Sequence, residues 1–232
     1  MIGIRKSKDR GHANFGWLDA YHSFSFGDYY DPQFTEFGNL RVLNEDKVSA
    51  QSGFPLHGHQ NMEILTYIIS GTLEHQDTLG NKEQIQPGEV QRMSAGRGIR
   101  HSEYNPTNDK TTHLFQIWFT PLENGIQPSY EQKSFSKELE KHPLVLVASQ
   151  SKKENSVYIH QDIEVFISRW RQPLSIEKKL VDHKMGWLQL AAGELEINGI
   201  KIQTGDAAYF KDLDHLQLNS TSPVEFVLIL QK

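Results

Sequence analysis

Short runs of alternating apolar and polar residues recur along the whole chain. They include "EILTYII", "HLFQIWF", "VYIHQDIEVFI", "MGWLQLAA", "ELEINGIKI" and "VEFVLIL". Turn-forming residues bound these runs, in pairs such as Ser70-Gly71, Pro87-Gly88 and Asn198-Gly199. Alternation with a period of two places successive side chains on opposite faces of a strand, and many short strands at close spacing are typical of sandwiches and barrels. The pattern therefore predicts an all-β protein.

One segment favours a helix instead. In "SFSKELEKHP", residues 134–143, Phe135 and Leu139 stand four apart, which places them on one helical face. Pro143 prevents the helix from continuing. We expect a short helix here, joining two halves of the chain.

The two halves resemble one another. "IISGTLEHQDTLGNKEQIQPGEV" and "LQLAAGELEINGIKIQTGDAAYF" both read as strand, glycine, strand, turn, strand and glycine. The first copy has Gly71 and Gly88 at these places, and the second has Gly193 and Gly205. Two copies of one β unit predict a protein of two lobes.

Composition narrows the classes of function. The 24 Lys and Arg against 29 Asp and Glu give a net charge of −5 with no long basic run, which argues against a nucleic-acid partner. Arg92, Arg97 and Arg100 form the nearest thing to a basic cluster, and we assign them to the adjacent motif or to solubility. No segment approaches the roughly 20 apolar residues of a membrane span. We expect a soluble, cytoplasmic monomer.

The chain has no cysteine, so any metal ion must be held by nitrogen and oxygen atoms. The stretch "FPLHGHQNMEIL" places His57 and His59 two residues apart. On a strand such side chains leave one face, roughly 6.5 to 7 Å apart, and two imidazoles so placed can converge on one ion. Glu63 has the same parity and is predicted on the same face. Taken alone, the stretch could also be a surface loop that holds histidines.

A second stretch, "MSAGRGIRHSEYNP", favours a metal site over a surface loop. A tight glycine turn precedes His101, Glu103 and Asn105, which alternate along a predicted strand. A buried carboxylate without a partner costs several kcal/mol, and a metal cation would remove that cost. The two stretches together predict the halves of one metal site, and the competing interpretation is a solvated face.

Both stretches resemble the cupin patterns His-x-His-x(3)-Glu with a following glycine, and Gly-x-x-His-x(3)-Asn. The matching positions are His57, His59, Glu63, Gly71, Gly98, His101 and Asn105. Together with "RGHANFGWLDAYHSFSFGDYYDP" near the N-terminus, they resemble the pirin family, most closely the bacterial pirin-like quercetin 2,3-dioxygenases.

The resemblance implies a bicupin, with two β-barrel or jelly-roll lobes joined by the short helix. We expect a metal-binding cupin domain over residues 1–133 and a degenerate cupin domain over residues 134–232. Counting from the repeated glycines places Lys179, Val181, Leu218 and Ser220 where the first lobe has its candidate ligands. These residues make no ligand set, so one metal per chain is expected.

The resemblance also implies a ligand set and a reaction. The ligands would be His57, His59, His101 and Glu103. Iron(II) is the first choice of metal, with zinc, nickel, copper, cobalt or manganese as other occupants. The reaction would open the heterocyclic ring of a flavonol such as quercetin with O₂, releasing carbon monoxide and a depside. Glu103 or Glu63 would be the base.

Two alternatives stay open: a metal-binding regulatory or redox-sensing protein without catalysis, and a cupin-type isomerase. An enzyme should have a substrate-sized pocket beside the metal, whereas a regulator should expose a docking surface. Four residues could wall a flat substrate or simply form core: Phe54, Phe115, Ile117 and Phe119. His75 and His113 lie on predicted strands of the same lobe, and either could reach the mouth of the cavity.

Overall fold

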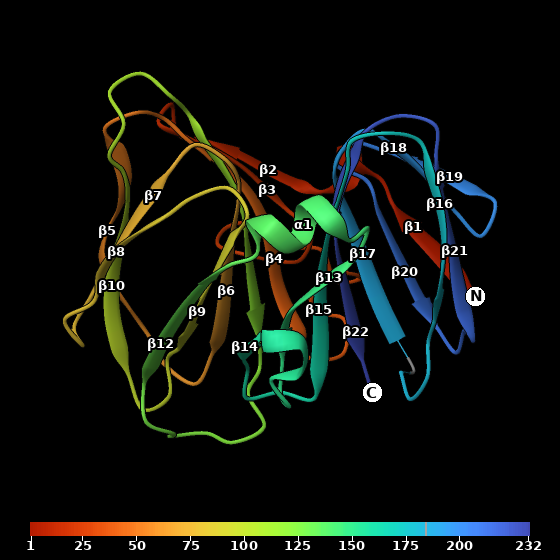
Figure 1. Ribbon diagram of the computed structural model, residues 1–232. Coiled ribbons are helices and arrows are strands. Elements are labelled where there is room, and N and C mark those ends of the chain that lie inside the picture. The colour runs from red at the N-terminus through yellow and green to blue at the C-terminus, as the bar shows by residue number, and fades with distance from the viewer. Residues whose placement is uncertain (184) are drawn as a thin grey trace. The chain divides into compact units, whose positions relative to one another are not determined.

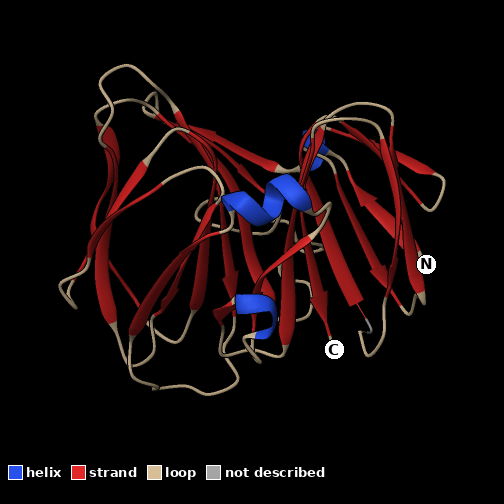
Figure 2. Ribbon diagram, viewed as in Figure 1, coloured by secondary structure: helices blue, strands red, loops and turns tan. Residues whose placement is uncertain are grey.

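The computed structural model describes residues 1–183 and 185–232, and most of them are in strands (Figure 2). The chain divides into two compact units. The N-terminal unit comprises residues 11–136 and 157–161, and the C-terminal unit comprises residues 1–10, 137–156 and 162–232. The all-β prediction is confirmed. Within the described residues, no helix is both long enough and apolar enough to span a membrane.

The N-terminal unit contains a larger and a smaller antiparallel sheet (Figure 1). The larger sheet runs in the order β12 (Ser129–Ser134), β9 (Glu89–Ser94), β6 (Glu63–Ser70), β11 (Thr112–Phe119), β4 (Leu40–Val48), β3 (Leu18–His22) and β2 (Gly11–Asn14). The smaller sheet runs in the order β5 (Ser52–His59), β10 (Ile99–Asn105), β7 (Leu73–Asp77) and β8 (Lys82–Ile85).

The C-terminal unit repeats this plan. Its larger sheet contains, in order, β1 (Ile2–Arg5), β20 (Ala207–Lys211), β17 (Met185–Ala192), β22 (Val224–Gln231), β15 (Ile163–Trp170) and β13 (Val145–Ser149). Its smaller sheet runs β16 (Leu174–Lys179), β21 (His215–Ser220), β18 (Glu194–Ile197) and β19 (Ile200–Gln203). The order β9-β6-β11-β4 thus corresponds to β20-β17-β22-β15, and β5-β10-β7-β8 to β16-β21-β18-β19. The predicted internal repeat is confirmed.

The repeated glycines mark turns that need glycine. Gly71 and Gly193 have φ angles of 86° and 92°, in the left-handed region. A Cβ atom on Gly71 would lie 2.7 Å from the Cα of Thr112, and one on Gly193 would lie 2.3 Å from the carbonyl oxygen of Pro223. Both the backbone angle and the close approach exclude a side chain at these positions.

The helical segments are short. Helix α1 (Ser136–Lys141) lies within the segment predicted to be helical, and 3₁₀ turns cover Ser7–Asp9 and Lys153–Asn155. The domain boundary between residues 133 and 134 stays a prediction. The compact units are not separated by a single cut, because β1 pairs with β20 and because residues 157–161, which contain β14 (Val157–Tyr158), cluster with the N-terminal unit. Alternation along a strand does not reveal which strand it will pair with.

The interior of the C-terminal unit is apolar. Its core cluster includes Leu195, Ile202, Leu216 and Leu218 from the smaller sheet. Leu216 and Leu218 lie on β21, which takes the place of β10 in the repeated strand order. This unit therefore fills with aliphatic side chains at the strands where the N-terminal unit has its histidine motifs. Its lack of a metal site stays a prediction.

Candidate metal centre

Neighbouring strands bring three histidines together. β5 and β10 pair antiparallel, with His101 opposite His57 and Ile99 opposite His59. The ring centroid of His101 lies 4.4 Å from that of His57 and 4.9 Å from that of His59. One ligand atom of each histidine lies within 4.8 Å of the others. The two sequence motifs thus meet in one cluster, which we call the imidazole cluster.

An irregularity in this strand pair sets the orientation of His57. On β5, His101 pairs with His57 and Glu103 pairs with Phe54, so the register shifts between them. One residue of β10 therefore faces two residues of β5, Pro55 and the residue after it, which form a bulge. Proline has no N–H for the ladder and is tolerated at such a bulge. The carbonyl oxygen of Pro55 lies 2.8 Å from Nδ1 of His57, which donates to it. In the neutral form of His57, the Nε2 atom therefore carries the lone pair.

Glu103 is buried and held from one side. Its Oε2 accepts a hydrogen bond of 2.7 Å from Nε2 of Gln116, whose Oε1 accepts one of 3.1 Å from Nε1 of Trp118. Together with His101 and His75, Glu103 forms a second group of ligand atoms close enough to share an ion. Both groups lie in the N-terminal unit, and they have His101 in common.

Three polar atoms in these groups are buried with no hydrogen-bond partner among the described residues. They are Nε2 of His59, Nε2 of His101 and Oε1 of Glu103. Burying such atoms unsatisfied is costly, and a cation among them would remove the cost. Imidazole nitrogens with one carboxylate oxygen suit a first-row divalent ion. These residues therefore fit a metal ion.

The electrostatics of the cluster favour the neutral form of two of its imidazoles, His59 and His101. Burial, together with the neighbouring His101 and His57, lowers the pKa of His59 to about 4. Burial likewise lowers the pKa of His101 to about 3, with contributions from His57 and His75. A neutral imidazole offers the lone pair that a metal ligand needs. At neutral pH, protons therefore do not compete for these two nitrogens.

The structure places Glu63 outside both groups of ligand atoms, so the prediction that it shares a face with the histidines is wrong. β5 ends at His59 and β6 begins at Glu63, and between them Asn61 has a left-handed φ of 50°. The alternation of side chains between the two faces of β5 therefore does not continue into β6. The carboxylate of Glu63 instead accepts hydrogen bonds from Oγ of Ser94 at 2.9 Å and from the backbone N–H of His160 at 3.0 Å.

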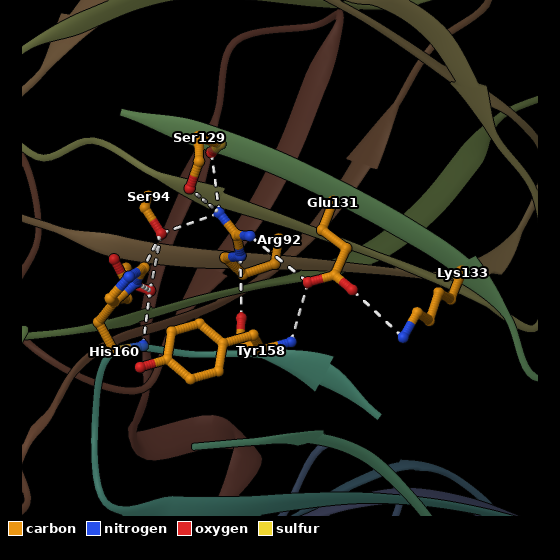
Figure 3. Close-up of polar contacts among 8 residues, drawn as sticks. Arg92, Ser94, Ser129, Glu131, Lys133, Tyr158 and His160 are labelled. Carbon is orange, nitrogen blue, oxygen red and sulfur yellow. Dashed lines mark hydrogen bonds and ion pairs between the residues drawn. The ribbon is translucent and has the colours of Figure 1, made fainter. Parts of the chain in front are cut away.

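Figure 3 shows the network around Ser94 and His160. Arg92 donates to Oγ of Ser94 at 2.9 Å, to Oγ of Ser129 at 2.7 Å and to the backbone carbonyl of Tyr158 at 3.0 Å. Arg92 is buried, so it serves neither the imidazole cluster nor solubility, contrary to expectation. With Glu63 it holds residues 157–161 in place, and we call Glu63, Arg92, Ser94 and His160 the clasp.

The clasp does not have the arrangement of a nucleophilic triad. Oγ of Ser94 and a carboxylate oxygen of Glu63 both approach Nδ1 of His160, at 3.1 and 3.2 Å. The imidazole therefore does not bridge the serine and the carboxylate, as a general base would have to do. Ser94 is also fully buried. The clasp is consistent with a structural role.

The remaining polar candidates divide between the imidazole cluster and the scaffold. His75 is fully buried, and its Nδ1 lies 3.3 Å from Nδ1 of His101, so it lies behind a candidate ligand and not at a cavity mouth. His113 pairs with Glu45 through a contact of 2.9 Å. Asn105 donates to the carbonyls of Val48 and Lys110, which identifies it as a turn-holding residue.

Half-buried aromatic rings flank the two half-buried histidines. The ring of Phe54 lies 6.4 Å from that of His57 and packs against Trp17, whereas the ring of Trp118 lies 4.8 Å from that of His59 and packs against Phe26. Of the other proposed wall residues, Phe115, Ile117 and Phe119 are fully buried core. Sequence reasoning missed Gln116 and Trp118, although a glutamine inside the apolar run "HLFQIWF" was a usable signal.

A surface depression of about 450 Å³ opens beside the imidazole cluster. His59, Thr78, Arg97 and Arg100 are among its lining residues. Arg97 and Arg100 are exposed, so their guanidinium groups give the depression a positive charge.

The chain is similar to known proteins over its whole length. The pirin model matches residues 3–119, and the model for the quercetinase C-terminal cupin domain matches residues 146–229. The chain is 46% identical to quercetin 2,3-dioxygenase of Escherichia coli K12 over 231 residues, covering 98% of this chain and 97% of that protein. It is 40% identical to a pirin-like protein of Caulobacter vibrioides over 230 residues, covering 99% of each.

Among solved structures, the bacterial pirin YhhW of Escherichia coli in complex with nickel(II) superposes with a TM-score of 0.93 at 44% identity. The match covers 100% of this chain and 99% of that one. These relatives and the repeated strand order confirm the prediction of two cupin domains. The chain belongs to the pirin family.

Proposed function

We propose that the chain binds one first-row divalent metal ion through Nε2 of His57, His59 and His101 and Oε1 of Glu103. The three buried atoms without partners support this assignment, and the Pro55 carbonyl leaves Nε2 of His57 free to join them. The nickel complex of the related YhhW supports metal binding at the family level. Iron(II) is our choice of ion for the reaction proposed below.

We further propose that the chain is a dioxygenase that opens the heterocyclic ring of flavonols such as quercetin. Both atoms of O₂ enter the depside product, and C3 of the flavonol leaves as carbon monoxide with its own oxygen. The metal ion would supply a Lewis acid that favours ionisation of the substrate's 3-hydroxyl group. The name of the relative that is 46% identical supports this reaction.

The chain's own residues would bind and orient a flat substrate. The aromatic pairs Trp17–Phe54 and Phe26–Trp118 flank the imidazole cluster and offer apolar faces to a ring. The depression of about 450 Å³ falls within the usual range of ligand sites, roughly 300 to 1,000 Å³. Arg97 and Arg100 at its edge would attract an ionised phenol.

Glu103 would also move the proton. Its Oε2 is held by Gln116, so Oε1 would turn from the metal ion to accept the proton of the 3-hydroxyl group. Glu63 is the weaker candidate, because Ser94 and His160 already occupy its Oε2 and because it belongs to neither group of ligand atoms. We therefore assign the base to Glu103 alone.

The observation that carries the proposal is the set of unpartnered ligand atoms beside half-exposed aromatic rings. The test is oxygen uptake with quercetin by chain stripped of metal and reloaded with iron(II) under argon, together with detection of carbon monoxide. Uptake that Glu103→Gln abolishes is expected. No uptake with iron demonstrably bound would reject quercetin as substrate and favour the regulatory or isomerase alternative.

A further inference from the structure

Behind the imidazole cluster, a line of three buried side chains runs from β7 to β10. Oδ2 of Asp77 lies 3.1 Å from Nε2 of His75, and Nδ1 of His75 lies 3.3 Å from Nδ1 of His101. The strands are direct neighbours, with His101 opposite Asp77 and Glu103 opposite His75. The side chains of His75 and Asp77 are 0% exposed. Bulk water therefore does not compete for these contacts.

The end of this line at Asp77 is fixed. Oδ1 of Asp77 accepts the backbone N–H groups of Leu79 at 2.8 Å and Asn81 at 3.1 Å, and Oδ2 accepts Nδ2 of Asn81 at 2.8 Å. Burial raises the pKa of Asp77, but the hydrogen bonds from Asn81, His75 and Leu79 outweigh it and hold the pKa below its ordinary value. The group is thus an ionised carboxylate that only accepts hydrogen bonds.

An acceptor at one end determines where the protons lie along the line. His75 must donate from Nε2 to Asp77, so in its neutral form its Nδ1 carries a lone pair. Nδ1 of His101 must then carry the proton that it donates to His75. This leaves the lone pair of His101 on Nε2, the atom that is buried with no hydrogen-bond partner in the described part of the chain.

We propose that Asp77 and His75 are positioning residues for His101, which hold its ring in the tautomer that offers Nε2 to a metal ion. This inference rests on the proposed metal centre and deepens it. Carboxylates and carbonyls that orient a ligating histidine commonly change metal affinity 10- to 100-fold when they are altered. The backbone carbonyl of Pro55 orients the ring of His57, whereas the side chains of His75 and Asp77 orient the ring of His101.

A rival arrangement would place a metal ion between the two Nδ1 atoms, because His75, His101 and Glu103 also form a group of potential ligands. The hydrogen bond favours a proton there. Nδ1 of His101 already has a partner in His75, and it is Nε2 that lacks one. The experiment below separates the two arrangements.

The test is a long-range ¹H–¹⁵N correlation spectrum of the full chain with ¹⁵N-labelled histidine, recorded without metal and with zinc. We expect His101 to carry its proton on Nδ1 in both spectra, with the ¹⁵N shift of Nε2 moving when zinc is added. A proton on Nε2 in the metal-free chain would overturn the proposal. Loss of the Nδ1 proton on adding zinc would establish the rival arrangement.

Asp77→Asn should reverse the direction of the hydrogen bonds along the line, which tests the proposal. The two backbone N–H groups keep the amide oxygen at the Oδ1 position. The amide nitrogen then faces Nε2 of His75 and donates to it, while the side-chain amide of Asn81 turns to present its oxygen in place of its nitrogen. His75 then carries its proton on Nδ1, which drives the proton of His101 to Nε2. Cobalt(II) affinity, measured by competition with a chromophoric chelator, should fall 10- to 100-fold.

Asp19→Asn is the matched control, since Asp19 pairs with His12 at 2.6 Å in the same unit and belongs to neither ligand group. It should bind cobalt(II) like the unaltered chain. Unchanged affinity in Asp77→Asn, with His101 still protonated on Nδ1, would overturn the proposal.

A second variant applies if Asp77→Asn fails to fold. In His75→Gln the amide oxygen can replace Nδ1 as the acceptor for His101, so this variant should retain cobalt(II) binding. Loss of cobalt(II) binding in His75→Gln would contradict the proposal. Correct tautomers in a chain that binds no metal would reject the metal centre while leaving the hydrogen-bonded line intact.

Discussion

Nε2 of Gln116 lies 2.7 Å from Oε2 of Glu103, and this contact fixes which carboxylate oxygen is free. Gln116 is itself held by Nε1 of Trp118 at 3.1 Å. The same tryptophan packs edge-on against His59, with ring centroids 4.8 Å apart. One strand, β11, therefore orients a proposed ligand, supports another and contributes an aromatic wall.

Replacing Gln116 with leucine should weaken metal binding. Glu103 would lose the donor to its Oε2 and become free to rotate, so we expect cobalt(II) affinity to fall about 10-fold, as is typical when a residue that orients a metal ligand is lost. Chelator competition measures the change. Gln189→Leu is the control, because Gln189 is a buried glutamine of the C-terminal unit that donates to the carbonyls of Gly205 and Asp206, whereas both ligand groups lie in the N-terminal unit. Equal cobalt(II) affinities in the two variants would show that Gln116 does not orient Glu103 for metal binding.

Glu63→Gln should destabilise the protein without changing its metal content. The carboxylate is fully buried and accepts two hydrogen bonds in the clasp, from Ser94 and the backbone of His160. Loss of its charge should lower the free energy of unfolding by about 2 kcal/mol. Urea denaturation measures this, and elemental analysis measures the metal. A normal free energy of unfolding with lost metal would instead place Glu63 at the metal centre.

The stability of the metal-free chain should depend on His101 in acid. Burial lowers the pKa of His101 to about 3, whereas in the unfolded chain it titrates near 6.5. Between pH 6.5 and 3 the unfolded state therefore binds a proton that the folded state does not, so the free energy of unfolding falls as the pH falls through this window. His101→Gln should show a smaller fall between pH 7 and 5. An identical fall in both chains would contradict this assignment.

The contribution of Asp46 to stability should depend on pH in the opposite direction to that of His101. Burial, together with the charges of Glu103 and Glu45, raises its pKa to about 8. The folded state then holds a proton that the unfolded state loses above the ordinary value of 3.8, so the contribution to stability falls as the pH rises from 3.8 to 8.

Asp46→Asn mimics the protonated form and should stabilise the metal-free chain at pH 8, by on the order of 2 kcal/mol. The gain should shrink towards pH 5. Urea denaturation at the two pH values measures the difference, and Asp19→Asn serves as a control at a half-buried carboxylate. A destabilised Asp46→Asn at pH 8 would show that the carboxylate is charged and needed.

The sequence predicted the features that depend on local alternation. His57 and His59 share one strand, and His101 and Glu103 share another, so a period of two was enough to place each pair on one face. Glu63 escaped this reasoning because the left-handed Asn61 ends the strand before it. A rule that counts residues cannot carry across such a break.

Features that depend on strand pairing could not be read from alternation. His75 reaches His101 only because β7 pairs with β10, and Gln116 reaches Glu103 from a strand of the other sheet in the same unit. The first strand of the chain, at Ile2–Arg5, pairs with β20 near the other end of the sequence. Each of these contacts joins two different strands, and alternation within one strand does not predict its partner.

The most direct test of the metal centre is an anomalous difference map from crystals of the chain loaded with cobalt(II), recorded at the cobalt edge. We predict one peak per chain, about 2.1 Å from Nε2 of His57, His59 and His101 and from Oε1 of Glu103. A peak between the Nδ1 atoms of His75 and His101, a peak at Glu63, or no peak in the N-terminal unit would contradict the account.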